Sequence, residues 1–165
     1  LRMTPDRIIV GECRGAEAVD MLQAMNTGHD GSLTTLHANA PRDALARLET
    51  MILMSGVDLP LRAIREQISS SVNLVVQTGR LADGRRKLLE VVEVVGLEEN
   101  IVKTQTIFKF EKLWIGKDGK VAGELVPTGI LPEFMKSIPG SFLEENAHLF
   151  KENKATSPVE EEVGK

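Results

Sequence analysis

An acid and a cation directly follow the first apolar run of the chain. Residues 8–10 are Ile-Ile-Val, Gly11 ends the run, and Glu12 and Arg14 come next. Such a run is typical of a strand buried on both faces, and α/β proteins bind ligands beyond the carboxyl ends of these strands. A carboxylate can orient water and a guanidinium can face a phosphate. The pair therefore predicts phosphate chemistry, with a surface ion pair as the structural alternative.

A second polar segment is flanked by glycines and holds two histidines. Gly28 and Gly31 enclose His29, and His37 follows a threonine-rich apolar run. The glycines permit close approach of the backbone to a ligand. An imidazole can donate to a phosphate oxygen or change its charge near neutral pH. If the two strands are parallel, His37 lies at the same sheet edge as Glu12, and a histidine bonded only to the backbone is the alternative.

Two other kinds of site use the same residues. Cys13, His29, Asp30 and His37 offer zinc-binding atoms, but no CxxC or HExxH spacing organises them. A cysteine–histidine nucleophile would need a motif around Cys13, and none is recognisable. One cysteine in the chain also excludes a disulfide framework.

The elements that must position these residues alternate in type. Apolar residues recur at helical spacing in three segments, each separated by glycine or proline signals. The expected strands are residues 7–12 and 32–38, and the expected helices are 15–27, 41–55 and 61–72. Alternation of this kind predicts an α/β fold with parallel strands.

The second part of the chain has a different pattern. Asp83-Gly84 and Asp118-Gly119 each lie between apolar runs, which is a strong hairpin signal. We therefore expect an antiparallel meander over residues 73–130, with strands at 73–78, 88–95 and 104–110 and a second hairpin between residues 113–115 and Val121. Residues 131–150 predict short helices broken by a Pro-Gly pair, and 151–165 predict a disordered tail.

Composition narrows the class of protein. The chain has 165 residues, a net charge of −4 and 42% hydrophobic residues, which excludes wholesale disorder. No apolar run is long enough to span a membrane, and no signal peptide is recognisable. The mild acidity argues against bulk binding of nucleic acid. All aromatic residues lie after residue 107, so two differently built parts are expected.

Two segments carry a resemblance to a known family. Residues 1–15, LRMTPDRIIVGECRG, resemble the Walker B region of the bacterial type II/IV secretion ATPases, and residues 26–39, NTGHDGSLTTLHAN, resemble their histidine box. The most similar branch is the CpaF-like motors of tight-adherence (Flp) pilus assembly. The match is dense to about Gly56 and recognisable to about Phe110. Both boxes, in this order and at close spacing, make the resemblance specific.

The resemblance implies a partial RecA-like P-loop NTPase core over residues 1–72, in a cytoplasmic hexameric motor peripheral to the inner membrane. Such motors hydrolyse ATP with Mg²⁺ and act with inner-membrane pilus or secretion platform proteins, without direct nucleic-acid partners. Glu12 matches the glutamate that orients the attacking water, near a Mg²⁺ held through water with no direct ligand. His37 matches the histidine that contacts the γ-phosphate. The matched nucleotide-site positions are Arg14, Gly28, His29 and Gly31.

One family feature is missing from the 165 residues. No segment fits GxxxxGK[ST], the loop whose amides cradle phosphates. We therefore expect the C-terminal portion of a motor, inactive on its own, with the loop upstream of Leu1. The alternatives are a non-catalytic oligomerisation or interaction module derived from that family, and a RecA-like protein that acts on DNA.

Overall fold

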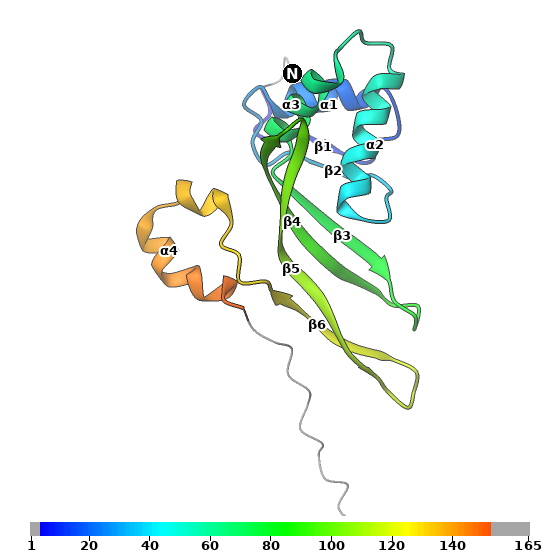
Figure 1. Ribbon diagram of the computed structural model, residues 1–165, viewed down its shortest axis with the longest axis vertical. Helices are drawn as coiled ribbons and strands as arrows, with labels where there is room; N and C mark the ends of the chain where they lie inside the picture. The colour runs from blue at the N-terminus through cyan, green and yellow to red at the C-terminus, as the bar shows by residue number, and fades with distance from the viewer. Residues whose placement is uncertain (1–3, 153–165) are drawn as a thin grey trace, which may run out of the picture. The chain divides into compact units, whose positions relative to one another are not determined.

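The computed structural model describes residues 4–152 (Figure 1). The chain divides into two compact units. The first comprises Leu1–Val75 and Val92–Gln105, and the second comprises Val76–Val91 and Thr106–Lys165. The predicted domain boundaries after residues 72, 130 and 150 stay predictions.

The first unit contains a short parallel sheet. Strand β1 (Ile9–Val10) pairs in parallel with β2 (Leu33–Thr34), and Ile9 lies opposite Leu33. The backbone N–H of Leu33 donates to the carbonyl oxygen of Ile8 at 3.0 Å. The parallel pairing predicted from the sequence is confirmed, although both strands are shorter than their apolar runs.

The predicted burial of the first strand on both faces is wrong. The exposed fraction of Ile9 is 67% and that of its neighbour Leu33 is 61%. The side chains of Ile9 and Leu33 are therefore open to solvent rather than buried. Within residues 4–152 the sheet has only these two strands. An apolar run indicates a strand, but it does not by itself specify what covers each face.

Three helices complete the α/β part of the first unit. They are α1 (Glu17–Met25), α2 (Pro41–Met54) and α3 (Leu61–Ser71). Pro41 is the first residue of α2 and has no backbone N–H, so it leaves no hydrogen-bond donor unpaired at the start of the helix. Gly56, with φ +81°, adopts the left-handed conformation soon after the end of α2. All three predicted helices are therefore present.

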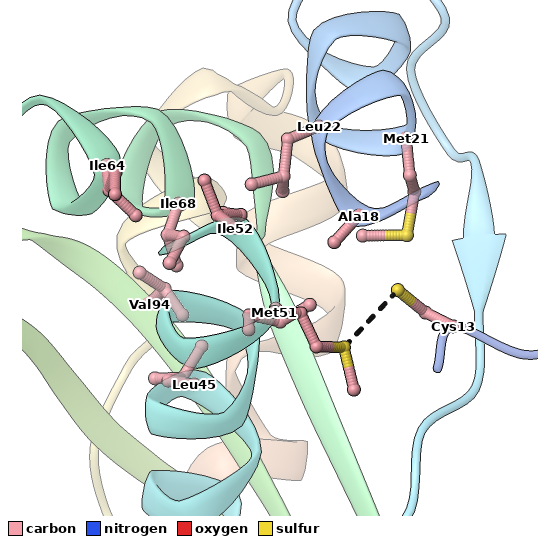
Figure 2. Close-up of a cluster of buried hydrophobic side chains, with 11 residues drawn as sticks. Cys13, Ala18, Met21, Leu22, Leu45, Met51, Ile52, Ile64, Ile68 and Val94 are labelled. Carbon is pink, nitrogen blue, oxygen red and sulfur yellow. Dashed lines mark hydrogen bonds between the residues drawn. The ribbon is translucent and has the colours of Figure 1, made fainter. Parts of the chain in front are cut away.

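The core of the first unit lies where the three helices meet (Figure 2). Each helix contributes a stripe of buried apolar residues. Leu22 of α1, Ile52 of α2, and Ile64 and Ile68 of α3 are fully buried. Strand β4 (Arg86–Glu98) adds Val94 to the same cluster. This core fixes α2, from which one side chain reaches the candidate site described below.

A four-stranded antiparallel meander follows α3, in the order β3–β4–β5–β6 (Figure 1). Its strands are β3 (Leu74–Arg80), β4 (Arg86–Glu98), β5 (Ile101–Ile115) and β6 (Val121–Pro127). Both Asp-Gly turns lie where predicted, which confirms the meander. The strand expected at 104–110 continues through residues 113–115 as β5, with an irregularity in its pairing to β6 between Lys112 and Trp114.

Short helices end the described part of the chain. They are η1 (Glu133–Ser137), α4 (Gly140–Asn146) and η2 (Ala147–Phe150), as expected from the sequence. The predicted tail lies almost wholly outside the described residues. Within residues 4–152, no helix has the length and apolar character needed to cross a membrane.

Candidate functional site

The loops after the two parallel strands are held against each other. The backbone N–H of Cys13 donates to the carbonyl oxygen of Thr35 at 2.8 Å. In return, the hydroxyl of Thr35 donates to the carbonyl oxygen of Gly11 at 2.6 Å. Because Glu12 lies between Gly11 and Cys13, this pair of bonds fixes its backbone beside the segment that leads to His37.

Glu12 lies between the guanidinium of Arg14 and the imidazole of His37. Its Oε1 is 3.1 Å from Nε2 of His37, and its Oε2 accepts a short hydrogen bond from Nη2 of Arg14. The side chain of Glu12 is 23% exposed, whereas those of Arg14 and His37 are 74% and 84% exposed. The hydrogen bond from Arg14 lowers the pKa of Glu12, and the charges of Arg14 and His37 lower it further. The carboxylate is therefore ionised at neutral pH.

Two side chains that the sequence did not single out hold this group in place. The carboxylate of Glu17 accepts hydrogen bonds from the backbone N–H groups of Arg14 and Gly15, at 2.5 and 3.1 Å. Nη1 of Arg47 on α2 donates to the carbonyl oxygen of His37 at 3.0 Å. An acid in the first turn of a helix is a recognisable signal for Glu17. No local pattern indicates Arg47, because its partner belongs to the preceding loop.

The structure gives His29 and its flanking glycines contacts of a different kind. Nδ1 of His29 donates to the carbonyl oxygen of Ala24, near the end of α1, at 3.1 Å. Gly28 and Gly31 both have positive φ, at 86° and 79°. A Cβ on Gly31 would lie 2.7 Å from Nε of Arg7, so the glycine there allows a close approach. These contacts are structural, and a nucleotide role for the three residues stays a prediction.

Cys13 is a core residue. Its thiol is 1% exposed, and its Sγ lies 3.8 Å from Sδ of Met51 (Figure 2). Burial raises the pKa of this thiol, which disfavours the thiolate that a nucleophile or a zinc ligand needs. Across residues 4–152, no three His, Cys, Asp or Glu side chains gather as a metal site.

The chemistry of these groups fits part of a nucleotide site. An ionised carboxylate accepts hydrogen bonds from water and can hold the water shell of Mg²⁺, which keeps several of its waters when bound. The exposed guanidinium of Arg14 and imidazole of His37 can donate hydrogen bonds to phosphate oxygens. The chain has no GxxxxGK[ST] loop to cradle the phosphates. The chemistry of Glu12, Arg14 and His37 therefore matches only the carboxylate side of such a site.

Comparison with known proteins shows the family to which the chain belongs. The sequence profile of the family described as "Type II/IV secretion system protein" matches residues 1–88, more than half of the chain. A Mycobacterium tuberculosis protein provisionally named for conjugal transfer is 41% identical over 112 residues, covering 68% of this chain and 31% of that protein. The conjugal transfer protein TrbB of Rhizobium radiobacter is 38% identical, covering 68% of this chain and 33% of that protein. The chain thus spans about a third of their length.

A solved structure matches the same region. It is the VirB11 ATPase of the Brucella suis type IV secretion system, in complex with sulphate. The identity is 37% and the TM-score is 0.51, covering 55% of this chain and 28% of that chain. The matched profile, together with these relatives, shows that the chain belongs to the type II/IV secretion system protein family.

Proposed function

We propose that this chain provides the Walker B glutamate and the histidine box of an ATP-hydrolysing motor that drives protein secretion or pilus assembly. The observation that carries the proposal is the position of Glu12. Its ionised carboxylate lies at the carboxyl edge of two parallel strands, between Arg14 and His37. This is the edge at which open α/β sheets bind ligands.

Each residue has a defined role in the proposal. Glu12 accepts a hydrogen bond from the attacking water and orients it. His37 and Arg14 present hydrogen-bond donors to the phosphate side, and Arg47 and Thr35 hold the two loops in register. ATP would supply the phosphoryl group, and Mg²⁺, held through water near Glu12, would supply neutralisation of the phosphate charge. Arg14, Gly28, His29 and Gly31 shape the nucleotide site.

The complete motor needs residues that this chain does not contain. The matched relatives are about three times as long as the matched portion, and we propose that a phosphate-cradling loop belongs to another part of the same protein. The motor then works as a hexamer on the cytoplasmic side of the inner membrane, with secretion or pilus platform proteins as partners. The finer proposal is a motor of the CpaF-like Flp pilus branch.

The test has two parts. The 165-residue chain alone should hydrolyse ATP at background rate, and clear turnover would contradict the need for the missing loop. In the longer protein that contains this chain, Glu12→Gln should lower kcat by about 10²–10⁴-fold, with nucleotide affinity retained. Glu66→Gln is the matched control, because Glu66 is exposed and pairs with Arg62 on α3. Normal turnover by Glu12→Gln would show that Glu12 does not orient the attacking water, whereas absence of turnover in the unmodified longer protein would favour a non-catalytic interaction module.

A further inference from the structure

A cleft of about 360 Å³ lies in the second unit, lined by residues of both Asp-Gly hairpins. The turns of these two hairpins lie at the same end of the meander (Figure 1). Arg85 lines it from the turn before β4, and Lys87 lines it from the start of β4. Trp114 lines it from β5, and Lys120 lines it from the turn before β6. Three cationic side chains and an indole ring thus converge on one opening. The family match over residues 1–88 does not reach Trp114 or Lys120.

The charge in the cleft is not balanced by its own acids. Asp118 is the one acidic residue in the lining, and its carboxylate lies 2.8 Å from Nζ of Lys120. Lys87 is exposed and has no carboxylate partner among residues 4–152. Arg85 pairs with Asp83. The ammonium of Lys87 is therefore unpaired within residues 4–152, whereas the cations of Arg85 and Lys120 each contact one carboxylate.

Arg85 is fixed before any ligand arrives. Its Nε donates to Oδ2 of Asp83 at 2.8 Å, and its Nη2 donates to the carbonyl oxygen of Val121 at 2.7 Å. The side chain of Asp83 is only 5% exposed, and it also accepts from the backbone N–H of Val121 at 2.7 Å. A guanidinium held in this way loses little conformational entropy on binding an anion.

The indole ring of Trp114 forms part of the cleft lining. Trp114 is 39% exposed, so part of its ring is available for contact with an apolar group.

The surrounding sequence reinforces the positive potential. Residues 80–87 and 109–124 together contain eight Lys or Arg residues and four Asp or Glu residues, although the whole chain has a net charge of −4. The basic excess is therefore concentrated on the hairpin segments that form the cleft. A local excess of one sign raises the local concentration of oppositely charged ligands.

We propose that this cleft binds a phosphate-bearing organic anion. The phosphate group lies among Lys87, Arg85 and Lys120, and the organic part contacts the ring of Trp114. A phosphate fits better than a carboxylate because its oxygens can accept donors from several directions, and the three cations come from different segments. The same chemistry is found in a soluble phosphate ester and in the headgroup of an anionic phospholipid. The proposal is independent of the function assigned to Glu12 and His37.

The chain carries its own reporter for this site. Trp114 is the only tryptophan and there is no tyrosine, so the indole fluorescence comes from the cleft alone. We expect glycerol phosphate to change this fluorescence saturably at about 150 mM salt. Lys87→Gln should raise the apparent Kd about tenfold, because a charge-assisted hydrogen bond is lost, and Lys120→Gln should also raise it. Lys109→Gln is the matched control, because Lys109 is exposed on β5 and does not line the cleft.

Each outcome has one meaning. Absence of a saturable change, an equal loss in Lys109→Gln, equal affinity for succinate, or binding of only a single-stranded oligonucleotide would overturn the proposal. Circular dichroism verifies that each variant folds, and shifts of the Gly116 and Gly123 amides in ¹H–¹⁵N spectra give a second readout of the same binding. Vesicles of phosphatidylglycerol and phosphatidylcholine then separate the two sources. Binding to phosphatidylglycerol vesicles identifies a lipid headgroup, whereas binding of glycerol phosphate without vesicle binding identifies a soluble ester.

Discussion

Nε2 of His37 lies 3.1 Å from Oε1 of Glu12, across the ends of two parallel strands. This contact depends on hydrogen bonds to the backbone of the two loops, which other side chains donate. The hydroxyl of Thr35 holds the carbonyl oxygen of Gly11, and the guanidinium of Arg47 holds that of His37. The geometry of the carboxylate–imidazole pair is therefore set by the two loops, and changes in the loops should alter function without changing either member of the pair.

Thr35→Val tests this dependence. The substitution keeps the shape of the side chain but removes the donor to Gly11, so the loop that carries Glu12 loses one of its two ties to the neighbouring loop. If the longer protein that contains this chain hydrolyses ATP as proposed, we expect its kcat to fall by about 10- to 100-fold, because small misplacements of catalytic groups slow the reaction strongly. Steady-state kinetics should show a much smaller change in KM for ATP.

Two further variants isolate the cause. Thr50→Val removes a hydroxyl that donates to the carbonyl oxygen of Ala46 within α2, and it should leave kcat unchanged. Thr35→Ser keeps the donor and should restore most of the rate. If Thr35→Val turned over at the normal rate, the hydrogen bond to Gly11 would have no role in placing Glu12.

Ile68→Ala measures how strongly the three-helix core stabilises the first unit. Ile68 is fully buried in α3 and belongs to the cluster shared by the three helices. Its truncation leaves a cavity, so we expect the free energy of unfolding to fall by about 2–5 kcal/mol. Ile101 has the same side chain but is 59% exposed, so Ile101→Ala should cost less than about 1 kcal/mol. Urea denaturation of both variants checks this, and equal losses would contradict the core assignment.

Much of the fold can be read from local patterns. Pro41 and Gly56 indicate the limits of α2, and the Asp-Gly pairs indicate both hairpin turns, because each pattern acts on the residues next to it. The parallel pairing of β1 with β2 also follows from the alternation of strand and helix.

The side-chain contacts between distant segments could not be predicted in the same way. Arg47 binds the loop that precedes its helix, and Asp83 binds the backbone of Val121 at the start of a different hairpin. Both contacts depend on how the elements pack, which single-sequence patterns do not encode. For the same reason, the sequence placed Glu12 and His37 at one edge but did not indicate the residues that hold them.

Asp83 should give the stability of the second unit a specific pH dependence. Hydrogen bonds from the Arg85 side chain and from the backbone N–H groups of Val121 and Arg85 hold the pKa of Asp83 well below its usual range. A carboxyl group with a depressed native pKa stabilises the fold above its unfolded pKa, and this contribution is lost as the pH falls below about 4. Asp83→Asn should therefore melt at a lower temperature than the wild type at pH 7, and the gap should narrow toward pH 2.

The control for Asp83 is a carboxylate without such partners. Asp58 has no ion pair within residues 4–152, and Asp58→Asn should melt like the wild type at every pH. Thermal melts by circular dichroism between pH 2 and pH 7 make the comparison. If the difference in melting temperature between Asp83→Asn and the wild type stayed constant over this range, the pKa of Asp83 would not be lower in the folded chain than in the denatured chain.

The exposed pair on the parallel sheet should make the isolated chain self-associate. Ile9 and Leu33 lie opposite each other and are 67% and 61% exposed, and within the described residues neither strand has a second neighbour. Unpaired strand edges beside apolar side chains favour pairing with another chain. We expect sedimentation velocity to show concentration-dependent association of the 165-residue chain. Ile9→Thr should reduce it, whereas Ile115→Thr, at a 52% exposed site on β5, should not. A strictly monomeric chain at all concentrations would show that this face is stable in water without a partner.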